Sequence, residues 1–180
     1  MYNPREDSYF LSEILKKELK NEKRESTFLD MGCGSGIQSL TALKFLDKKN
    51  ITAVDIDKES IKETKKLGIK VINSNLFSKL KNKKYDIIAF NPPYLKEDKY
   101  DKNKDTTGGK FGDETILDFL LQAKNHLNKN GEIFLLLSSL TPKKRINKII
   151  KQDYKIKNIF KKELFMEKLF VYELANKHIS

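Results

Sequence analysis

The feature that most constrains this chain is a glycine-rich turn between a predicted strand and a predicted helix. Residues 27–31 form a short apolar run, and Gly32, Gly34 and Gly36 follow it directly. Glycine allows the backbone to turn tightly and to approach a ligand closely. A dinucleotide-binding fingerprint would have its third glycine one position later, where this chain has Ile37. The turn therefore favours a nucleoside ligand without phosphates over a pyrophosphate.

The chain of 180 residues has the length of one domain, and we treat residues 1–180 as a single unit. Short apolar runs alternate with longer helical patterns, which predicts an α/β sheet domain. The expected strands are 27–31, 51–55, 69–72, 85–90, 132–137, 154–160 and 169–174, and the expected helices are 6–20, 37–46, 58–67, 114–127 and 142–150. Residues 1–26 form an extension with a helix before the first strand, and residues 96–112 a polar, mobile loop.

Composition narrows the cellular setting and the chemistry. No apolar run is long enough to span a bilayer, and residues 1–10 lack the apolar core of a signal peptide, so we expect a cytoplasmic protein. One cysteine and two histidines predict neither an internal disulfide nor a metal site in this chain. The net charge of +11 could attract nucleic acid, but the lysines are spread along the whole chain. Charge alone therefore does not identify a substrate.

An acidic pair at the end of the second predicted strand supports the nucleoside interpretation. Asp55 ends that strand, and a carboxylate there can accept hydrogen bonds from both ribose hydroxyls. Asp57 is expected to cap the next helix instead. With the glycine turn, this arrangement resembles the class I, Rossmann-like methyltransferases over nearly the whole chain.

That resemblance implies a fold and a cofactor. The fold is a seven-stranded, mostly parallel sheet with one antiparallel strand and helices on both faces. The cofactor is S-adenosylmethionine, with S-adenosylhomocysteine as its product. The resemblance places Asp30 near the methionine part of the cofactor, Ile56 beside Asp55 in the cofactor site, and Asn75 and Leu76 beside the adenine.

The segment Asn91-Pro92-Pro93-Tyr94 directly follows the fourth predicted strand and is the candidate catalytic motif. Two prolines restrain the backbone, so the Asn91 side-chain oxygen and the Pro92 carbonyl can both accept from one NH2 group. This holds a planar nitrogen and favours positive charge on it during methyl transfer. Tyr94 can stack on a planar amide or base. The motif resembles that of methyltransferases acting on exocyclic amines or amides and does not separate adenine from glutamine.

Further features resemble the HemK-type glutamine methyltransferases, in their short archaeal and eukaryotic branch. The N-terminal segment contains Asp7 and Ser8, which in that family lie against the cofactor. Gly108 and Gly109 resemble a family loop that borders the substrate cleft. Only about 26 residues precede the first predicted strand, so we expect this chain to lack the helical recognition domain of the bacterial enzymes, as the short branch does.

The family resemblance also implies partners. The substrate would be the glutamine of a Gly-Gly-Gln loop in a class I release factor, methylated on its side-chain nitrogen. A small zinc-binding activator would pair with the sheet edge near Ile69 to Ile72. Two other functions remain open: an adenine N6-methyltransferase on DNA or RNA, and a non-catalytic S-adenosylmethionine-binding protein.

Overall fold

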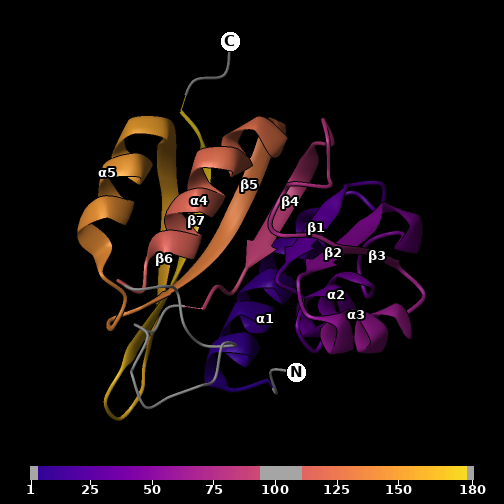
Figure 1. Ribbon diagram of the computed structural model, residues 1–180, viewed down its shortest axis with the longest axis horizontal. Helices are drawn as coiled ribbons and strands as arrows, with labels where there is room; N and C mark the ends of the chain where they lie inside the picture. The colour runs from indigo at the N-terminus through magenta and orange to yellow at the C-terminus, as the bar shows by residue number, and fades with distance from the viewer. Residues whose placement is uncertain (1–3, 94–110, 178–180) are drawn as a thin grey trace.

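The computed structural model describes residues 4–93 and 111–177, in which a seven-stranded sheet has the order β3-β2-β1-β4-β5-β7-β6 (Figure 1). The first five strands of that order are mutually parallel, and β7 is antiparallel to both β5 and β6. This confirms the predicted fold class. The strands are β1 (Phe28–Met31), β2 (Ile51–Asp55), β3 (Lys70–Asn73), β4 (Tyr85–Phe90), β5 (Leu127–Ser138), β6 (Tyr154–Glu163) and β7 (Lys168–Asn176).

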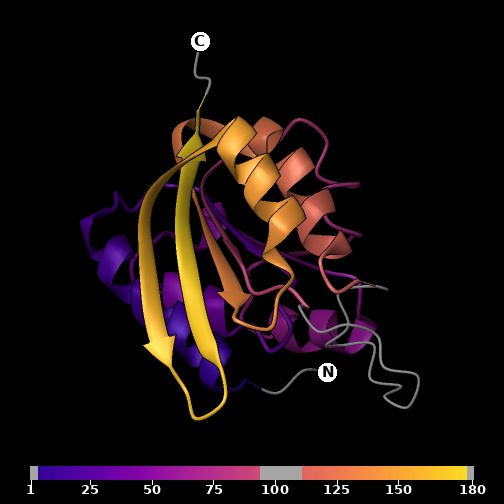
Figure 2. The same ribbon diagram turned by 90° about the vertical axis from the view of Figure 1, so that its left-hand side faces the viewer.

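Helices cover both faces of the sheet, as Figures 1 and 2 show from two directions. On one face, Leu11 and Leu15 of α1 pack with Ala42 of α2 over Phe28 and Ala53 of the sheet. The other face is covered by α4 and α5. The helices are α1 (Glu6–Glu18), α2 (Ile37–Ala42), α3 (Lys58–Lys65), α4 (Glu114–Ala123) and α5 (Lys143–Asp153), with 3₁₀ turns at Leu19–Asn21, Lys48–Asn50 and Lys124–His126. Within the described residues, no helix is long and apolar enough to cross a membrane.

The register of the central strands brings the predicted site residues to one edge of the sheet. Met31 at the end of β1 lies opposite Val54 of β2 and Phe90 of β4. The glycine turn, Asp55 and Asn91 follow these three positions directly in the sequence. In open α/β sheets, ligands bind at the carboxyl ends of parallel strands.

The predicted boundaries differ most from those of the structure at three places. The second helix ends at Ala42 rather than near residue 46, and the fourth ends at Ala123 rather than near residue 127. The fifth strand begins at Leu127 rather than near residue 132, because Leu127 already pairs with Tyr85 across a register shift. Gly131 makes this pairing possible, since a Cβ there would lie 2.7 Å from the Tyr85 carbonyl oxygen. Asn-Lys-Asn-Gly thus continues a strand that local turn propensity alone would interrupt.

The third predicted strand is an edge of the sheet, as expected. Lys70–Asn73 pairs with β2 on one side, and β3 is the first strand in the sheet order. Binding of an activator at this edge stays a prediction.

Candidate active site

A cavity of about 610 Å³ opens at the carboxyl ends of β1, β2 and β4. This is the volume range of small-molecule and cofactor sites. Its lining includes nearly all the site residues predicted from the sequence that the structure describes. They are Asp7, Ser8, Asp30, Gly32, Gly34, Asp55, Ile56, Asn75, Leu76, Asn91, Pro92 and Pro93. Tyr94, Gly108 and Gly109, and most of the predicted loop 96–112, lie outside the described residues.

The glycine turn forms the floor of the cavity, and its conformation requires residues that have no side chain. Gly36 has φ +76° and begins α2, and a Cβ there would lie 3.0 Å from the Thr64 hydroxyl oxygen. Gly32 has φ +61°, and its Cβ would lie 3.2 Å from the Phe90 ring. Residues other than glycine rarely adopt such φ values. Gly36 does not itself line the cavity, so its role is to shape the turn.

Asp55 is held by the backbone at the rim of the cavity. One carboxylate oxygen accepts from Gly34 N at 2.8 Å, and the other accepts from Asp57 N at 2.9 Å. Each oxygen keeps a lone pair for a further donor. Asp57 caps α3 as predicted: its carboxylate accepts from Ser60 N at 2.7 Å, and this hydrogen bond lowers the pKa of Asp57. The two neighbouring acids therefore have different roles.

Asp30 lies on β1 beneath the turn and is almost fully buried. One of its carboxylate oxygens accepts from Ser39 N at 2.9 Å and from Ser39 Oγ at 2.6 Å. Burial raises the pKa of Asp30 to about 7, and the Asp55 charge adds to this, whereas the Ser39 hydrogen bonds oppose it. Asp30 thus anchors the start of α2, and its protonation changes near neutral pH.

Asn75 and Leu76 follow β3 and form one wall. Ser74 N donates to the Asp55 carbonyl at 2.9 Å, which brings this segment to the end of β2. Ile56, on the same side of the cavity, is 69% exposed. The wall therefore combines the exposed Asn75 with apolar surface, which suits a flat heterocycle.

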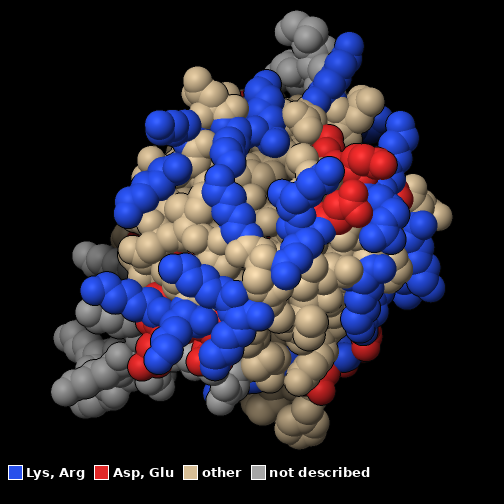
Figure 3. Space-filling view, turned by 90° about the vertical axis from the view of Figure 1, so that its right-hand side faces the viewer, with Lys and Arg blue, Asp and Glu red and all other residues tan. Residues whose placement is uncertain are grey.

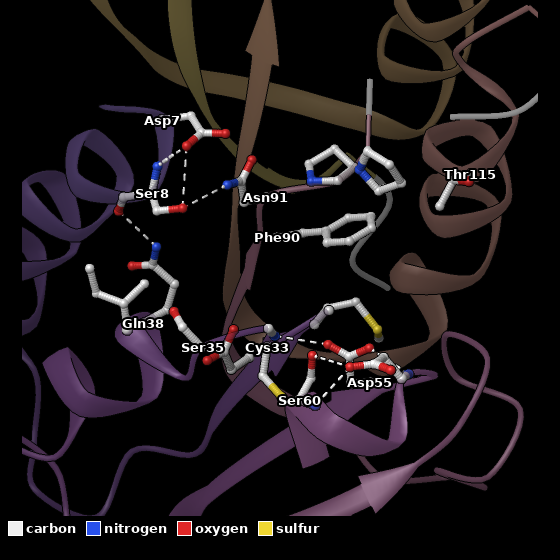
Figure 4. Close-up of a pocket in the computed structure, with 18 of the residues that line it drawn as sticks. Asp7, Ser8, Cys33, Ser35, Gln38, Asp55, Ser60, Phe90, Asn91 and Thr115 are labelled. Atoms are coloured by element: carbon white, nitrogen blue, oxygen red, sulfur yellow. Dashed lines mark hydrogen bonds between the residues drawn. The ribbon is translucent and has the colours of Figure 1, made fainter. Parts of the chain in front are cut away.

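Asn91 follows β4 and is linked to the first turn of α1. Its Nδ2 donates to Ser8 Oγ at 3.3 Å. Ser8 is itself close to Asp7, whose Oδ1 accepts from Ser8 N at 2.6 Å. Figure 4 shows the Asn91 amide pointing toward Ser8 across the upper part of the cavity. Asp7, Ser8 and Asn91, which are far apart in the sequence, thus lie together at the cavity.

The Asn91 Oδ1 atom has no hydrogen-bond partner among the described residues, although it is shielded from solvent. A buried acceptor without a donor costs roughly 1–3 kcal/mol, so each such atom needs an explanation. The hydrogen bond from Nδ2 to Ser8 fixes the orientation of the amide. Oδ1 can therefore accept from a donor that is not among the described residues.

The charge of the cavity is opposite to that of the whole chain. Its described lining holds six carboxylates and one guanidinium: Glu6, Asp7, Asp30, Asp55, Asp57 and Glu167, against Arg5. The chain as a whole has a net charge of +11. A concave site lined by one sign of charge concentrates ligands of the other sign. This cavity favours a cationic ligand and disfavours phosphates.

Sequence reasoning missed several lining residues. Gln38 and Phe90 line the cavity next to predicted positions, and Thr115 and Glu167 reach it from distant segments. Gln38 had a local signal, since it is a polar residue two positions after the glycine turn, at the start of an expected helix. Thr115 and Glu167 had none. The described residues contain no cluster of His, Cys, Asp or Glu that could hold a metal ion.

The chain is similar in sequence to known proteins. A Methanocaldococcus jannaschii protein, provisionally named protein N5-glutamine methyltransferase, is 34% identical over 183 aligned positions, covering 95% of this chain and 89% of the relative. A release factor glutamine methyltransferase of Fusobacterium nucleatum is 40% identical over 106 positions, but these cover 54% of this chain and 30% of that protein.

The fold also has solved counterparts. The crystal structure of a ribosomal protein L11 methylase from Lactobacillus delbrueckii subsp. bulgaricus matches with a TM-score of 0.71 and 20% identity, covering 98% of this chain and 81% of that one. The family model described as methyltransferase small domain matches residues 8–166. The chain therefore belongs to the methyltransferase small domain family.

Proposed function

We propose that this methyltransferase transfers a methyl group from S-adenosylmethionine to the side-chain amide nitrogen of a glutamine in the Gly-Gly-Gln loop of a class I release factor. The observation that carries the proposal is the unpaired Oδ1 of Asn91, whose Nδ2 is bound to Ser8. A buried oxygen without a hydrogen-bond partner needs a donor, and a primary amide supplies one through its N–H groups. The names of the two curated relatives support glutamine as the source of that amide.

The residues of the cavity fit the cofactor. Asp55 is placed to accept from ribose hydroxyls, and the wall of Ile56, Asn75 and Leu76 suits adenine. The six carboxylates of the lining match a ligand whose sulfonium and ammonium groups are both cationic. S-adenosylmethionine, when bound, supplies a methyl group on an electrophilic sulfonium.

The chain's own residues would then orient the nitrogen. Asn91 Oδ1, with the Pro92 carbonyl, accepts hydrogen bonds from the substrate NH2 and directs the nitrogen lone pair into the cavity. These oxygens would also stabilise the positive charge that develops on nitrogen as its bond to the methyl carbon forms and the bond from that carbon to sulfur breaks, which leaves S-adenosylhomocysteine. The excess proton leaves to solvent after the transfer, so no general base has to act first. Ser8 keeps the Asn91 amide in the required orientation.

The charge pattern argues for a protein amide over a nucleic-acid base. Figure 3 shows Lys and Arg side chains spread over the face that carries α3 and β3, with Asp and Glu among them. Exposed lysines on these elements include Lys62, Lys65 and Lys70. The cavity itself is acidic. A base flipped into it would bring its phosphates toward carboxylates, which is unfavourable.

The test is transfer of labelled methyl from S-adenosylmethionine to three substrates side by side. These are an archaeal-type class I release factor, its Gly-Gly-Gln→Gly-Gly-Ala variant, and a mixture of duplex DNA with tRNA. Each is assayed with and without an archaeal zinc-binding activator protein. We expect label on the first substrate alone. Label on nucleic acid, or equal label on the Gly-Gly-Ala variant, would overturn the assignment to glutamine.

A further inference from the structure

Gln38 is a buried amide at the start of α2, and it has no role in the reaction proposed above. Its side chain is 4% exposed and lines the cavity. Its Nε2 donates to the Ser8 backbone carbonyl at 2.9 Å. Its Oε1 has no partner among the described residues and is shielded from solvent. An apolar side chain of the same size would avoid this cost, so the unpaired Oε1 needs an explanation.

Ser8 connects this amide to Asn91. Its backbone oxygen accepts from Gln38, and its hydroxyl accepts from the Asn91 amide at 3.3 Å. Gln38 is 30 positions and Asn91 is 83 positions from Ser8 in the sequence. Figure 4 shows Ser8 between the two amides, with dashed lines to both. Displacement of Gln38 would therefore disturb Asn91 through Ser8.

The position of Gln38 also determines which part of the cofactor is nearest. Asp55, Ile56 and Asn75, which suit an adenosine, lie at the β2 and β3 side of the cavity. In the proposed function the reacting nitrogen would bind at Asn91, which directly follows β4. Gln38 and Ser8 belong to α2 and α1, away from the adenosine side. If the adenosine lies on the β2 and β3 side, the amino-acid end would extend toward Gln38, and its ammonium would be the N–H donor that Oε1 lacks.

We propose that Gln38 has two roles: its Oε1 accepts a hydrogen bond from the ammonium group of the bound cofactor, and its Nε2 positions Asn91 through Ser8. This inference rests on the proposed function, because it takes S-adenosylmethionine as the cofactor. Its consequence is that occupancy of the amino-acid subsite is linked to the orientation of the catalytic amide.

The test compares two probes by calorimetry, S-adenosylhomocysteine and 5′-methylthioadenosine, which lacks the amino-acid end. Gln38→Leu removes both the donor and the acceptor at nearly constant size. Because one hydrogen bond to a charged group is lost, we expect about tenfold weaker binding of S-adenosylhomocysteine. Binding of 5′-methylthioadenosine should stay unchanged. Equal affinities to the wild type, or equal weakening of both probes, would overturn the role in cofactor binding.

The matched variant Gln38→Glu separates the two roles. Glutamate keeps an acceptor for the ammonium, and its ionised carboxylate cannot donate to the Ser8 carbonyl. We expect S-adenosylhomocysteine to bind as well as to the wild type, while kcat falls about tenfold with the KM for cofactor unchanged. Weaker binding of S-adenosylhomocysteine to this variant, or an unchanged kcat, would contradict the proposal, and this holds even if Gln38→Leu fails to fold. Failure of the wild type to bind S-adenosylhomocysteine would instead contradict the proposed function itself.

Discussion

Replacement of Asn91 by alanine should separate activity from stability. In the unliganded protein the amide contributes one long hydrogen bond, 3.3 Å from Nδ2 to Ser8 Oγ, which we value at about 0.5–1.5 kcal/mol. Against this, the unpaired Oδ1 costs roughly 1–3 kcal/mol while it stays shielded. The two effects nearly cancel, so we expect the free energy of unfolding of Asn91→Ala to lie within about 1 kcal/mol of the wild type.

The effect on turnover should be much larger. Removal of one preorganised polar partner of the developing charge typically lowers kcat by about 10²–10³-fold. The assay measures single-turnover methyl transfer to the release factor, with S-adenosylhomocysteine affinity and thermal unfolding on the same preparations. Affinity for S-adenosylhomocysteine should be retained, because the atoms that contact the substrate nitrogen are not those at Asp55.

The control is Asn147→Ala, an exposed position on α5, which should leave both turnover and stability unchanged. Unchanged turnover in Asn91→Ala would refute its catalytic role. A fall in the melting temperature of more than about 5 °C would refute the energetic argument, since 1 kcal/mol corresponds to roughly 2–4 °C in a domain of this size.

Three further predictions concern the cofactor turn. Asp55→Ala should weaken S-adenosylhomocysteine binding by about 1.5–3 kcal/mol in calorimetry. Asp57→Ala should instead cost about 1 kcal/mol of stability through the lost helix cap and leave the affinity unchanged. Equal affinities in the two variants would exclude Asp55 from the site. Burial raises the Asp30 pKa from its ordinary 3.8 to about 7, so its contribution to stability is complete below pH 3.8 and is lost as the pH rises through 7. Asp30→Asn should therefore gain stability relative to the wild type from pH 4 to pH 8, by on the order of 4 kcal/mol in denaturant titrations, and a pH-independent difference would contradict this. Gly36→Ala should lower stability by about 1–3 kcal/mol in the same titrations, because alanine is strained at φ +76° and its Cβ would lie close to Thr64. An unchanged denaturation midpoint would show that the turn relaxes without cost.

Those parts of the fold that depend on local pattern were predictable from the sequence. The strands 51–55 and 85–90 have the predicted bounds, because both are mainly apolar segments between clear breaks. Asp55 is the last residue of the first of these strands, and Asn91 directly follows the second. In a parallel sheet both residues therefore lie at the same edge. For the same reason the glycine turn, at the end of β1, was placed correctly.

Contacts between distant segments were not predictable. The hydrogen bonds that join Gln38 and Asn91 to Ser8 depend on how α1 is rotated on the sheet, and its apolar residues do not fix that rotation to within a hydrogen-bond distance. Glu167 lies in the connection between β6 and β7, and no local pattern shows that this connection lines the cavity. The early start of β5 depends on the contact between Gly131 and the Tyr85 carbonyl, which no local pattern reveals.

The direction of β7 has a practical consequence for handling the protein. Because β7 is antiparallel to β5, it ends at Asn176 on the side of the sheet where the parallel strands begin, opposite the cavity. By contrast, α1 begins at Glu6, which lines the cavity. A surface tether or a fluorescent reporter attached after β7 would leave the entrance clear for a large protein substrate. The same attachment before α1 would obstruct the entrance to the cavity. For binding experiments, the protein should therefore be immobilised through its carboxyl end.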